Sequence, residues 1–189
     1  MRRRVCGFMN DSDGKVYTSE LSLANKFARG LWAMVYILFF RITPRPMHDW
    51  RCCILRLFGA EIGVGVKVYG SARIWAPWHL RMGDGAILGD RVDCYSVTHI
   101  TIGAHSVISQ DSCLCAATHD HRSDAFTLIP KPILIGDRAW IAARAFVGPG
   151  VTVGKHAVVG ACAVVFKDVS DGVTVVGNPA KEISRKVQI

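Results

Sequence analysis

Residues 135–165 read IGDRAWIAARAFVGPGVTVGKHAVVGACAVV, with an aliphatic residue at every sixth position. The members of this series are Ile135, Ile141, Val147, Val153, Val159 and Val165. A period of six is neither the period of about 3.6 of an α-helix nor the period of about 2 of an isolated strand, so it indicates short strands separated by corners. The pattern is typical of a parallel β-helix rather than of a β-sandwich.

The same period extends towards the N-terminus of the chain. Its earlier members form three blocks that begin at Ile62, Met82 and Ile102, 20 residues apart. We therefore expect coils of 20 residues, followed by coils of 18 residues that begin at Ile135 and Val153. Small residues recur four places after a periodic residue, which suits a narrow prism with one large and one small side chain on each inner face: Ala139, Ala145, Ala157 and Ala163. The predicted β-helix spans residues 60–170.

Composition and charge indicate one domain with anionic partners. The chain has 189 residues, half of them hydrophobic, and a net charge of +8. A positive balance favours phosphorylated cofactors and anionic membrane surfaces. The basic residues form no nucleic-acid-binding motif, so no nucleic-acid partner is expected. Seven cysteines without a secretory signal indicate reduced thiols, and the predicted location is the cytoplasm.

Residues 1–59 differ in character from the predicted β-helix. Residues 1–20 are polar, and we expect them to fray. The apolar run 31–40 (LWAMVYILFF) is too short for a membrane span, which needs about 20 residues. Two interpretations stay open: a helix packed on the β-helix or on a neighbouring subunit, or a helix in the membrane interface with Trp32, Tyr36 and the flanking arginines as anchors. Residues 47–58 predict a second, amphipathic helix that caps the first coil.

The six-residue period is interrupted once, by residues 115–134. A long loop in an otherwise regular solenoid is usually functional, and this loop contains His119 and His121. Imidazole titrates near neutral pH and is the commonest general base. The spacing leaves two interpretations open for each histidine, a catalytic base and a solvated loop residue.

Several motifs together resemble those of the hexapeptide-repeat acyltransferases. They are the six-residue period, Thr118-His119-Asp120, Ile135-Gly136-Asp137-Arg138-Ala139-Trp140-Ile141, Val147-Gly148-Pro149-Gly150-Val151-Thr152-Val153-Gly154 and Gly177-Asn178-Pro179-Ala180. The chain is most similar to the branch with maltose, galactoside and nodulation acetyltransferases and to the acetyltransferases of colanic-acid and other exopolysaccharide clusters. The exopolysaccharide group is also similar in the stretch from Pro44 to Ala60. The resemblance covers roughly residues 25–185.

The resemblance implies an all-β fold, the left-handed parallel β-helix, with a short helical N-terminal region. It also implies a homotrimer with active sites between subunits, and acetyl transfer from acetyl-CoA to a saccharide hydroxyl without a metal. His119 matches the family's general base, which takes the proton as the hydroxyl attacks the thioester directly. The backbone N–H of Ala143 matches the donor that stabilises the oxyanion. Trp140 matches a tryptophan that lines the acceptor side; packing beneath the loop is its alternative role.

The resemblance further implies a set of cofactor contacts. The matching residues are Ala143, Ala161, Phe166, Lys167 and Lys181. We expect the two lysines to neutralise the phosphates of acetyl-CoA, the alternative being ordinary surface lysines. Residues 171–189 are expected to close the cofactor site.

Two positions depart from the family pattern. Ala142 replaces a Gly that follows Trp-Ile, and Gly89 stands where the small-sugar enzymes carry an Asn near the catalytic His. Asp90 and Asp93 are the neighbours that can take the place of this Asn, and we expect Asp93 and His121 to contact the acceptor. Acceptor identity is therefore not carried over from the maltose and galactoside enzymes. A lipid-linked or nucleotide-linked exopolysaccharide precursor is expected, with the protein peripheral at the inner face of the cytoplasmic membrane.

Two other functions stay open on the residues alone. Cys113, Cys115, His119 and His121 form a C-x-C-x₃-H-x-H cluster, which suggests a zinc enzyme similar to the γ-carbonic anhydrases. The two cysteines flank the inward Leu114, however, so both would point away from the core while the histidines lie on the loop. A β-helix scaffold without catalysis is the third reading.

Overall fold

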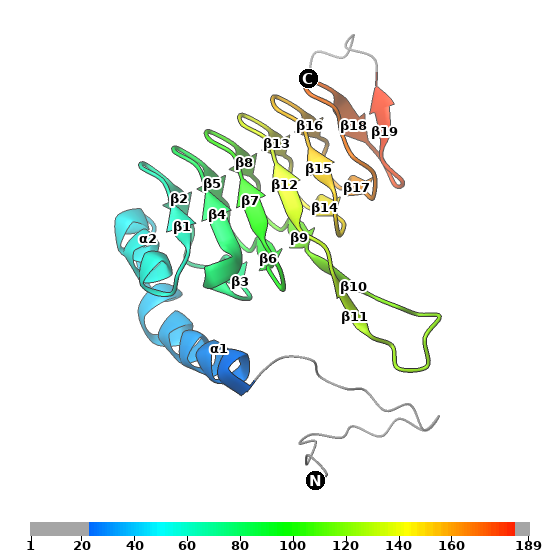
Figure 1. The fold of residues 1–189 in the computed structure, drawn as a ribbon. Helices are drawn as coiled ribbons and strands as arrows, with labels where there is room; N and C mark the ends of the chain where they lie inside the picture. Colours follow the sequence, from blue (N-terminus) through cyan, green and yellow to red (C-terminus); the bar gives the residue numbers. More distant parts are fainter. Residues whose placement is uncertain (1–22, 184–189) are drawn as a thin grey trace.

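The computed structural model describes residues 23–183, which form a parallel β-helix with two helices at its N-terminal end (Figure 1). The polar segment 1–20 and the last part of segment 171–189 lie outside the described residues. Each coil contributes one short strand to each of three sheets, which are the three faces of a prism. This confirms the fold expected from the period.

The strands are grouped by face. The first face contains β1 (Glu61–Ile62), β4 (Leu80–Met82), β7 (Ile100–Ile102), β12 (Ile133–Ile135) and β15 (Thr152–Val153). The second face contains β2 (Lys67–Val68), β5 (Ile87–Leu88), β8 (Val107–Ile108), β13 (Trp140–Ile141), β16 (Val158–Val159), β18 (Thr174–Val176) and β19 (Lys181–Ile183). The third face contains β3 (Arg73–Ile74), β6 (Asp93–Tyr95), β9 (Cys113–Cys115), β14 (Phe146–Val147) and β17 (Val164–Val165). All neighbours within a face run parallel except β18 and β19.

The register of the coils follows the sequence period. Ile62 pairs with Met82, Met82 with Ile102, Ile102 with Ile135, and Ile135 with Val153. These stacked residues lie at equivalent positions of successive coils, as the spacing predicted.

Large and small side chains alternate inside the prism. The periodic aliphatic residues are buried, and so are the four alanines predicted to face inward: Ala139, Ala145, Ala157 and Ala163. Successive coils approach so closely at some corners that only glycine fits. A Cβ atom on Gly136 would lie 2.6 Å from the backbone nitrogen of Lys155. The sequence therefore encodes both the core and the spacing of the coils.

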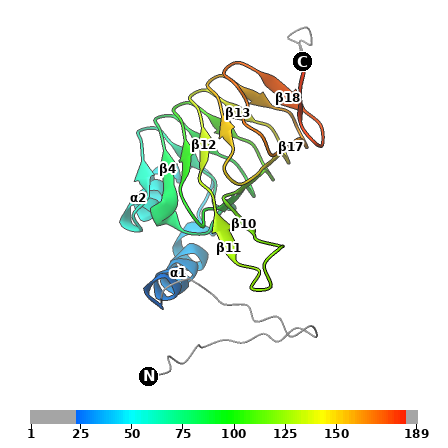
Figure 2. The same ribbon diagram turned by 45° about the vertical axis from the view of Figure 1, so that its right-hand side comes forward.

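The excursion predicted at residues 115–134 is a β-hairpin rather than an irregular loop. Its strands, β10 (Ala117–His119) and β11 (Leu128–Pro130), pair antiparallel. This pairing satisfies the backbone polar groups of a segment that leaves the prism. The hairpin projects away from the β-helix (Figures 1 and 2).

Two helices precede the first coil. Helix α2 (His48–Leu57) packs on β1 and β2 and buries Cys52, Ile54 and Leu55, so it caps the open end of the prism as predicted. Helix α1 (Leu23–Val35) continues into a π-helical turn, Tyr36–Phe40. No helix within residues 23–183 combines the length and apolar character needed to cross a membrane.

The packing of α1 corrects one expectation from the sequence. Trp32 is buried and donates its indole N–H to the carbonyl of Ile74 at 2.7 Å. Tyr36 packs against Trp32 with ring centroids 5.8 Å apart. Both aromatic residues therefore face the β-helix, and the suggestion that they anchor the chain in a membrane interface was wrong. A buried indole N–H needs a hydrogen-bond acceptor, and Trp32 finds this acceptor inside the protein.

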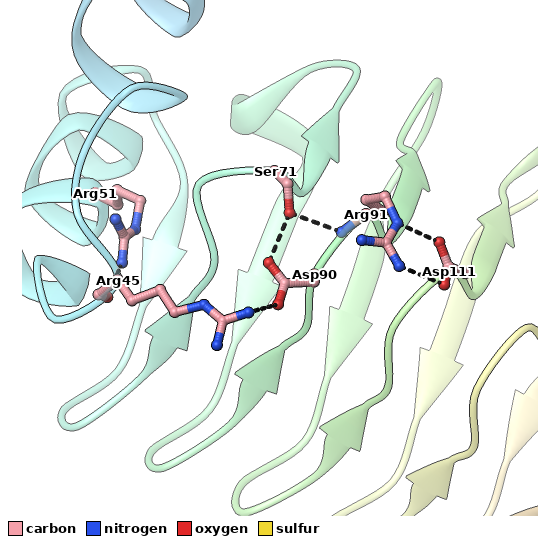
Figure 3. A network of polar contacts seen from close by, with 6 residues as sticks. All are labelled: Arg45, Arg51, Ser71, Asp90, Arg91 and Asp111. Carbon is pink, nitrogen blue, oxygen red and sulfur yellow. Dashed lines mark hydrogen bonds and ion pairs between the residues drawn. The ribbon is translucent and has the colours of Figure 1, made fainter.

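A buried arginine ties the segment after α1 to the β-helix. Arg51 is fully buried, and its guanidinium donates to the carbonyls of Val68 at 2.6 Å and Pro44 at 2.9 Å. Burial lowers the pKa of Arg51. Nearby, Arg45 pairs with Asp90 at 3.0 Å, and Asp90 accepts a hydrogen bond from Ser71 (Figure 3). These contacts fix the path of the chain between α1 and α2.

Candidate functional site

The imidazole of His119 is exposed at the end of β10 and held in one orientation. Its ring stacks on Phe126 with centroids 4.4 Å apart and planes 12° apart, and Nδ1 lies 2.9 Å from the Phe126 carbonyl. A carbonyl can only accept, so Nδ1 carries the hydrogen and Nε2 of the neutral ring is the basic nitrogen. Within residues 23–183, Nε2 has no hydrogen-bond partner. The geometry leaves a lone pair available to an incoming proton donor.

His121 lies beyond the last paired residue of β10. It is exposed in the turn of the hairpin, where Asp120 accepts a hydrogen bond from the backbone N–H of Arg122 at 3.1 Å. The structure thus places His119 on a paired strand and His121 in the turn of the same hairpin, and among the described residues ring contacts are found for His119.

The corner between the second and third faces carries a small residue on two successive coils, Ala143 and Ala161. The N–H groups of Ala143 and Ala161 have no acceptor within the described part of the chain. The two residues are stacked on successive coils, since the N–H of Cys162 donates to the carbonyl of Ala143 at 3.0 Å. Preceding coils carry Asp90 and Gln110 at this corner position. The methyl side chains of the two alanines therefore leave room for a ligand to reach the backbone.

Trp140 stands on the outer surface of the second face. Its indole N–H donates to Oγ of Ser109 at 2.9 Å, and the side chain is 44% exposed. The hairpin leaves the prism at the opposite edge, between the third and first faces. Packing of Trp140 beneath the hairpin of its own chain, one of the two roles considered above, is therefore excluded.

A pocket of about 340 Å³ lies at the C-terminal end of the β-helix. Phe166, Lys167 and Lys181 line it together with Pro179. Phe166 is exposed and packs against Phe146 with ring centroids 5.5 Å apart. The structure therefore gathers three of the five residues predicted to contact the cofactor, and Ala143 and Ala161 lie apart from them at the corner described above.

One chain does not bring His119 and the Ala143 corner together. The hairpin leaves the edge between the third and first faces, where the N–H of Lys131 donates to the carbonyl of Ala116 at 2.9 Å. Ala143 and Ala161 lie on a different edge of the prism, and Trp140 lies on the face opposite the hairpin edge. Each chain therefore carries two separated halves of the predicted site.

Asp93 lines a groove of about 400 Å³ between α1 and the third face. Burial raises the pKa of Asp93, and the nearby Arg73 opposes this shift. Asp90, the other candidate, is engaged with Arg45 and Ser71 (Figure 3). Trp75 and Tyr95, which no sequence motif singled out, also line the groove. Their position in the sequence could have indicated this. Trp75 follows the inward Ile74 and Tyr95 follows the inward Cys94, so both side chains are expected to face outward.

The predicted zinc cluster does not assemble in this structure. No group of three or more potential metal ligands occurs among residues 23–183. Cys113 and Cys115 flank the buried Leu114 on β9, whereas His119 stacks on Phe126 out on the hairpin. Burial raises the pKa of Cys113 to about 12, which disfavours the thiolate that a zinc ligand must provide.

Comparisons with known proteins identify similar chains and the family model that this chain matches. Residues 132–167 match the family model described as bacterial transferase hexapeptide (six repeats). WcaF of Escherichia coli, named for acetyl transfer in colanic acid biosynthesis, is 48% identical over 95% of this chain and 99% of its own length. Galactoside O-acetyltransferase of Lactococcus lactis is 26% identical over 94% of this chain and 88% of its own.

A solved structure has the same fold. The hexapeptide-repeat acetyltransferase VCA0836 of Vibrio cholerae, crystallised with acetyl coenzyme A, superposes with a TM-score of 0.80 at 25% identity. The alignment covers 92% of this chain and 95% of that protein.

Proposed function

This chain belongs to the hexapeptide-repeat acetyltransferases and uses acetyl-CoA, and we propose that it transfers the acetyl group to a hydroxyl of a saccharide. The observation that carries the proposal is the imidazole of His119, exposed and oriented with Nε2 free among the described residues. Such a nitrogen suits a general base for a hydroxyl, which is a poor nucleophile until its proton is removed.

In the proposed reaction, Nε2 of His119 takes the hydroxyl proton while the hydroxyl oxygen attacks the thioester carbonyl. The C–O bond forms as the carbonyl oxygen gains negative charge. The N–H of Ala143 donates to this oxyanion, because it has no other acceptor among residues 23–183. Collapse of the intermediate breaks the C–S bond, and the imidazolium returns the proton to the departing sulfur. No acetyl-enzyme forms.

We propose that the two halves of the site come from different copies in a homotrimer. The separation of the hairpin edge from the Ala143 corner supports this, because a chain cannot bring its own His119 to its own Ala143 without leaving the fold. The projecting hairpin suits insertion beside the corner of a neighbour (Figure 2). Closed rings of identical subunits form such contacts head to tail. Trp140 would then line the acceptor side.

Mixing two inactive variants tests the shared site. His119→Ala removes the base, and Ala161→Trp blocks the approach to the corner. Co-assembly at equal amounts is expected to restore about one quarter of the wild-type activity, since a site needs an intact hairpin from one copy and an intact corner from another. Thiol release from acetyl-CoA measures the restoration. Mixed assemblies that stay inactive would contradict a site shared between copies.

Lys167 and Lys181 are proposed to bind the phosphates of acetyl-CoA, with residues 171–189 closing the cofactor site. The shared pocket and the positive charge support this role. Phe166 and Ala161 are proposed to contact the remainder of the cofactor.

Replacing either lysine by alanine is expected to raise KM for acetyl-CoA about tenfold at low salt, with little change in kcat. The phosphates are remote from the thioester, so their contacts stabilise ground and transition states alike. The effect should shrink at high salt because ions screen exposed charges. Lys155→Ala is the matched control, since Lys155 is exposed at another corner and pairs with Asp137 at 3.4 Å. If all three variants have the same KM for acetyl-CoA as the natural chain, neither Lys167 nor Lys181 binds the phosphates.

The proposed acceptor is a lipid-linked or nucleotide-linked precursor of an exopolysaccharide in the cytoplasm. The identity with WcaF over nearly the whole chain supports this class, as does the similarity to a galactoside O-acetyltransferase. Asp93 and His121 are proposed to contact the acceptor. The groove at Asp93 offers aromatic surface and charge, which suit a sugar ring.

A further inference from the structure

Helix α1 and the following turn carry a stripe of large apolar side chains that remain exposed in the described part of the chain. Its members recur at spacings of three or four residues, which places them on one side of a helix. They are Leu23, Phe27, Leu31, Met34 and Leu38, and they are between 43% and 79% exposed. Ile37, Phe39 and Ile42 widen the patch and are also exposed.

The opposite side of the same helix is already packed on the β-helix. Trp32 and Phe40 are buried there, with ring centroids 5.7 Å apart. The helix is therefore apolar on two sides, and packing within the chain accounts for only one of them. A contiguous exposed apolar patch of this kind marks an interaction surface.

The charges around the stripe identify the kind of surface that fits it. Residues 23–48 contain no Asp or Glu. Lys26 and Arg41 are exposed beside the stripe, whereas Arg29 lies over the ring of Trp75 at 3.5 Å and Arg45 pairs with Asp90. Among residues 23–183 neither Lys26 nor Arg41 forms a salt bridge, and an apolar stripe bordered by such cations complements lipid tails beneath anionic head groups.

We propose that this outward stripe docks the protein on an anionic lipid bilayer, with α1 lying in the plane of the interface. The stripe would sink into the boundary between head groups and acyl chains, and Lys26 and Arg41 would remain among the head groups. The packed side keeps the helix attached to the β-helix through Trp32.

Docking would also orient the proposed active site. Figures 1 and 2 both show α1 and the β10–β11 hairpin on the same side of the β-helix. A bilayer that receives α1 would therefore lie on the side towards which the hairpin that carries His119 projects. This orientation suits a lipid-linked acceptor and rests on the proposed function; the docking itself does not.

Vesicle flotation without acetyl-CoA tests the docking independently of catalysis. The probes are vesicles of phosphatidylglycerol with phosphatidylcholine, and vesicles of phosphatidylcholine alone. The triple variant Leu31→Gln, Met34→Gln, Leu38→Gln is expected to bind the anionic vesicles at least about tenfold more weakly than the natural chain. The control variant Leu57→Gln, Val64→Gln removes apolar side chains that are even more exposed but lie elsewhere, and it is expected to bind like the natural chain.

Two results would overturn the proposal. One is equal binding of the triple variant and the natural chain to anionic vesicles. The other combines two findings: light scattering shows that the triple variant has dissociated into smaller assemblies, and the natural chain binds neither kind of vesicle. The stripe would then face another copy of the chain. Unchanged thermal unfolding of the variant shows that the helix remains packed.

Discussion

Replacing His119 by alanine is expected to lower kcat for acetyl transfer about 10²–10⁴-fold, the usual loss when a general base is removed. The side chain is exposed on a hairpin outside the hydrophobic core, so the melting temperature and the binding of acetyl-CoA should stay close to those of the natural protein. Steady-state release of thiol from acetyl-CoA measures the loss, and calorimetric titration measures cofactor binding.

His121→Ala is the matched control for this substitution, because it removes the same group two residues away on the same hairpin. Its loss should be smaller and should fall mainly on KM for the acceptor. A chain that remains active without His119 and becomes inactive without His121 would reverse the assignment of the base.

Ala143→Pro is expected to lower kcat about 10²–10³-fold, since it deletes the N–H proposed to stabilise the oxyanion. The chain itself indicates that proline fits this turn. Pro149 occupies the equivalent place in the following corner and precedes Gly150 at φ +78°, just as Ala143 precedes Arg144 at φ +61°. The substitution therefore removes the N–H donor, and the backbone conformation of the turn is expected to stay nearly the same.

Gln110→Pro is the control for the loss of a backbone N–H at this corner. Gln110 lies one coil earlier, precedes Asp111 at φ +60°, and within the described residues its N–H also has no acceptor. The variant should keep activity within about twofold of the natural chain, since no reacting group is placed there. Equal losses in both proline variants would show that the corner acts through its shape and that the Ala143 N–H has no special role.

The β-helix could be predicted in detail because the sequence pattern that specifies each coil lies within a short stretch of chain. Each coil repeats the same few φ/ψ states, so the position of Ile135 in the period fixes its neighbours above and below. Helix α2 was predictable for a similar reason, since its apolar face must cover an open coil. The excursion was visible as an interruption, but its hairpin pairing depends on contacts between β10 and β11 that no period records.

The site was less accessible to prediction than the fold. The motifs identify His119 and Ala143, but the sequence does not reveal that they lie on different edges of the prism. Trp32 and Tyr36 were considered membrane anchors because aromatic residues in an apolar run fit an interface, yet they pack on the β-helix. Both sides of α1 are apolar, so composition could not tell which side faces inward.

The most direct test of the account is a single-turnover experiment with acetyl-CoA labelled in the acetyl group, a panel of exopolysaccharide precursors and an excess of chelator. The label is expected to pass to a saccharide as an O-acetyl ester, with one thiol released per ester and no labelled protein. Bound acetyl-CoA without transfer to any saccharide hydroxyl would contradict it, as would transfer that stops with the chelator and returns with zinc.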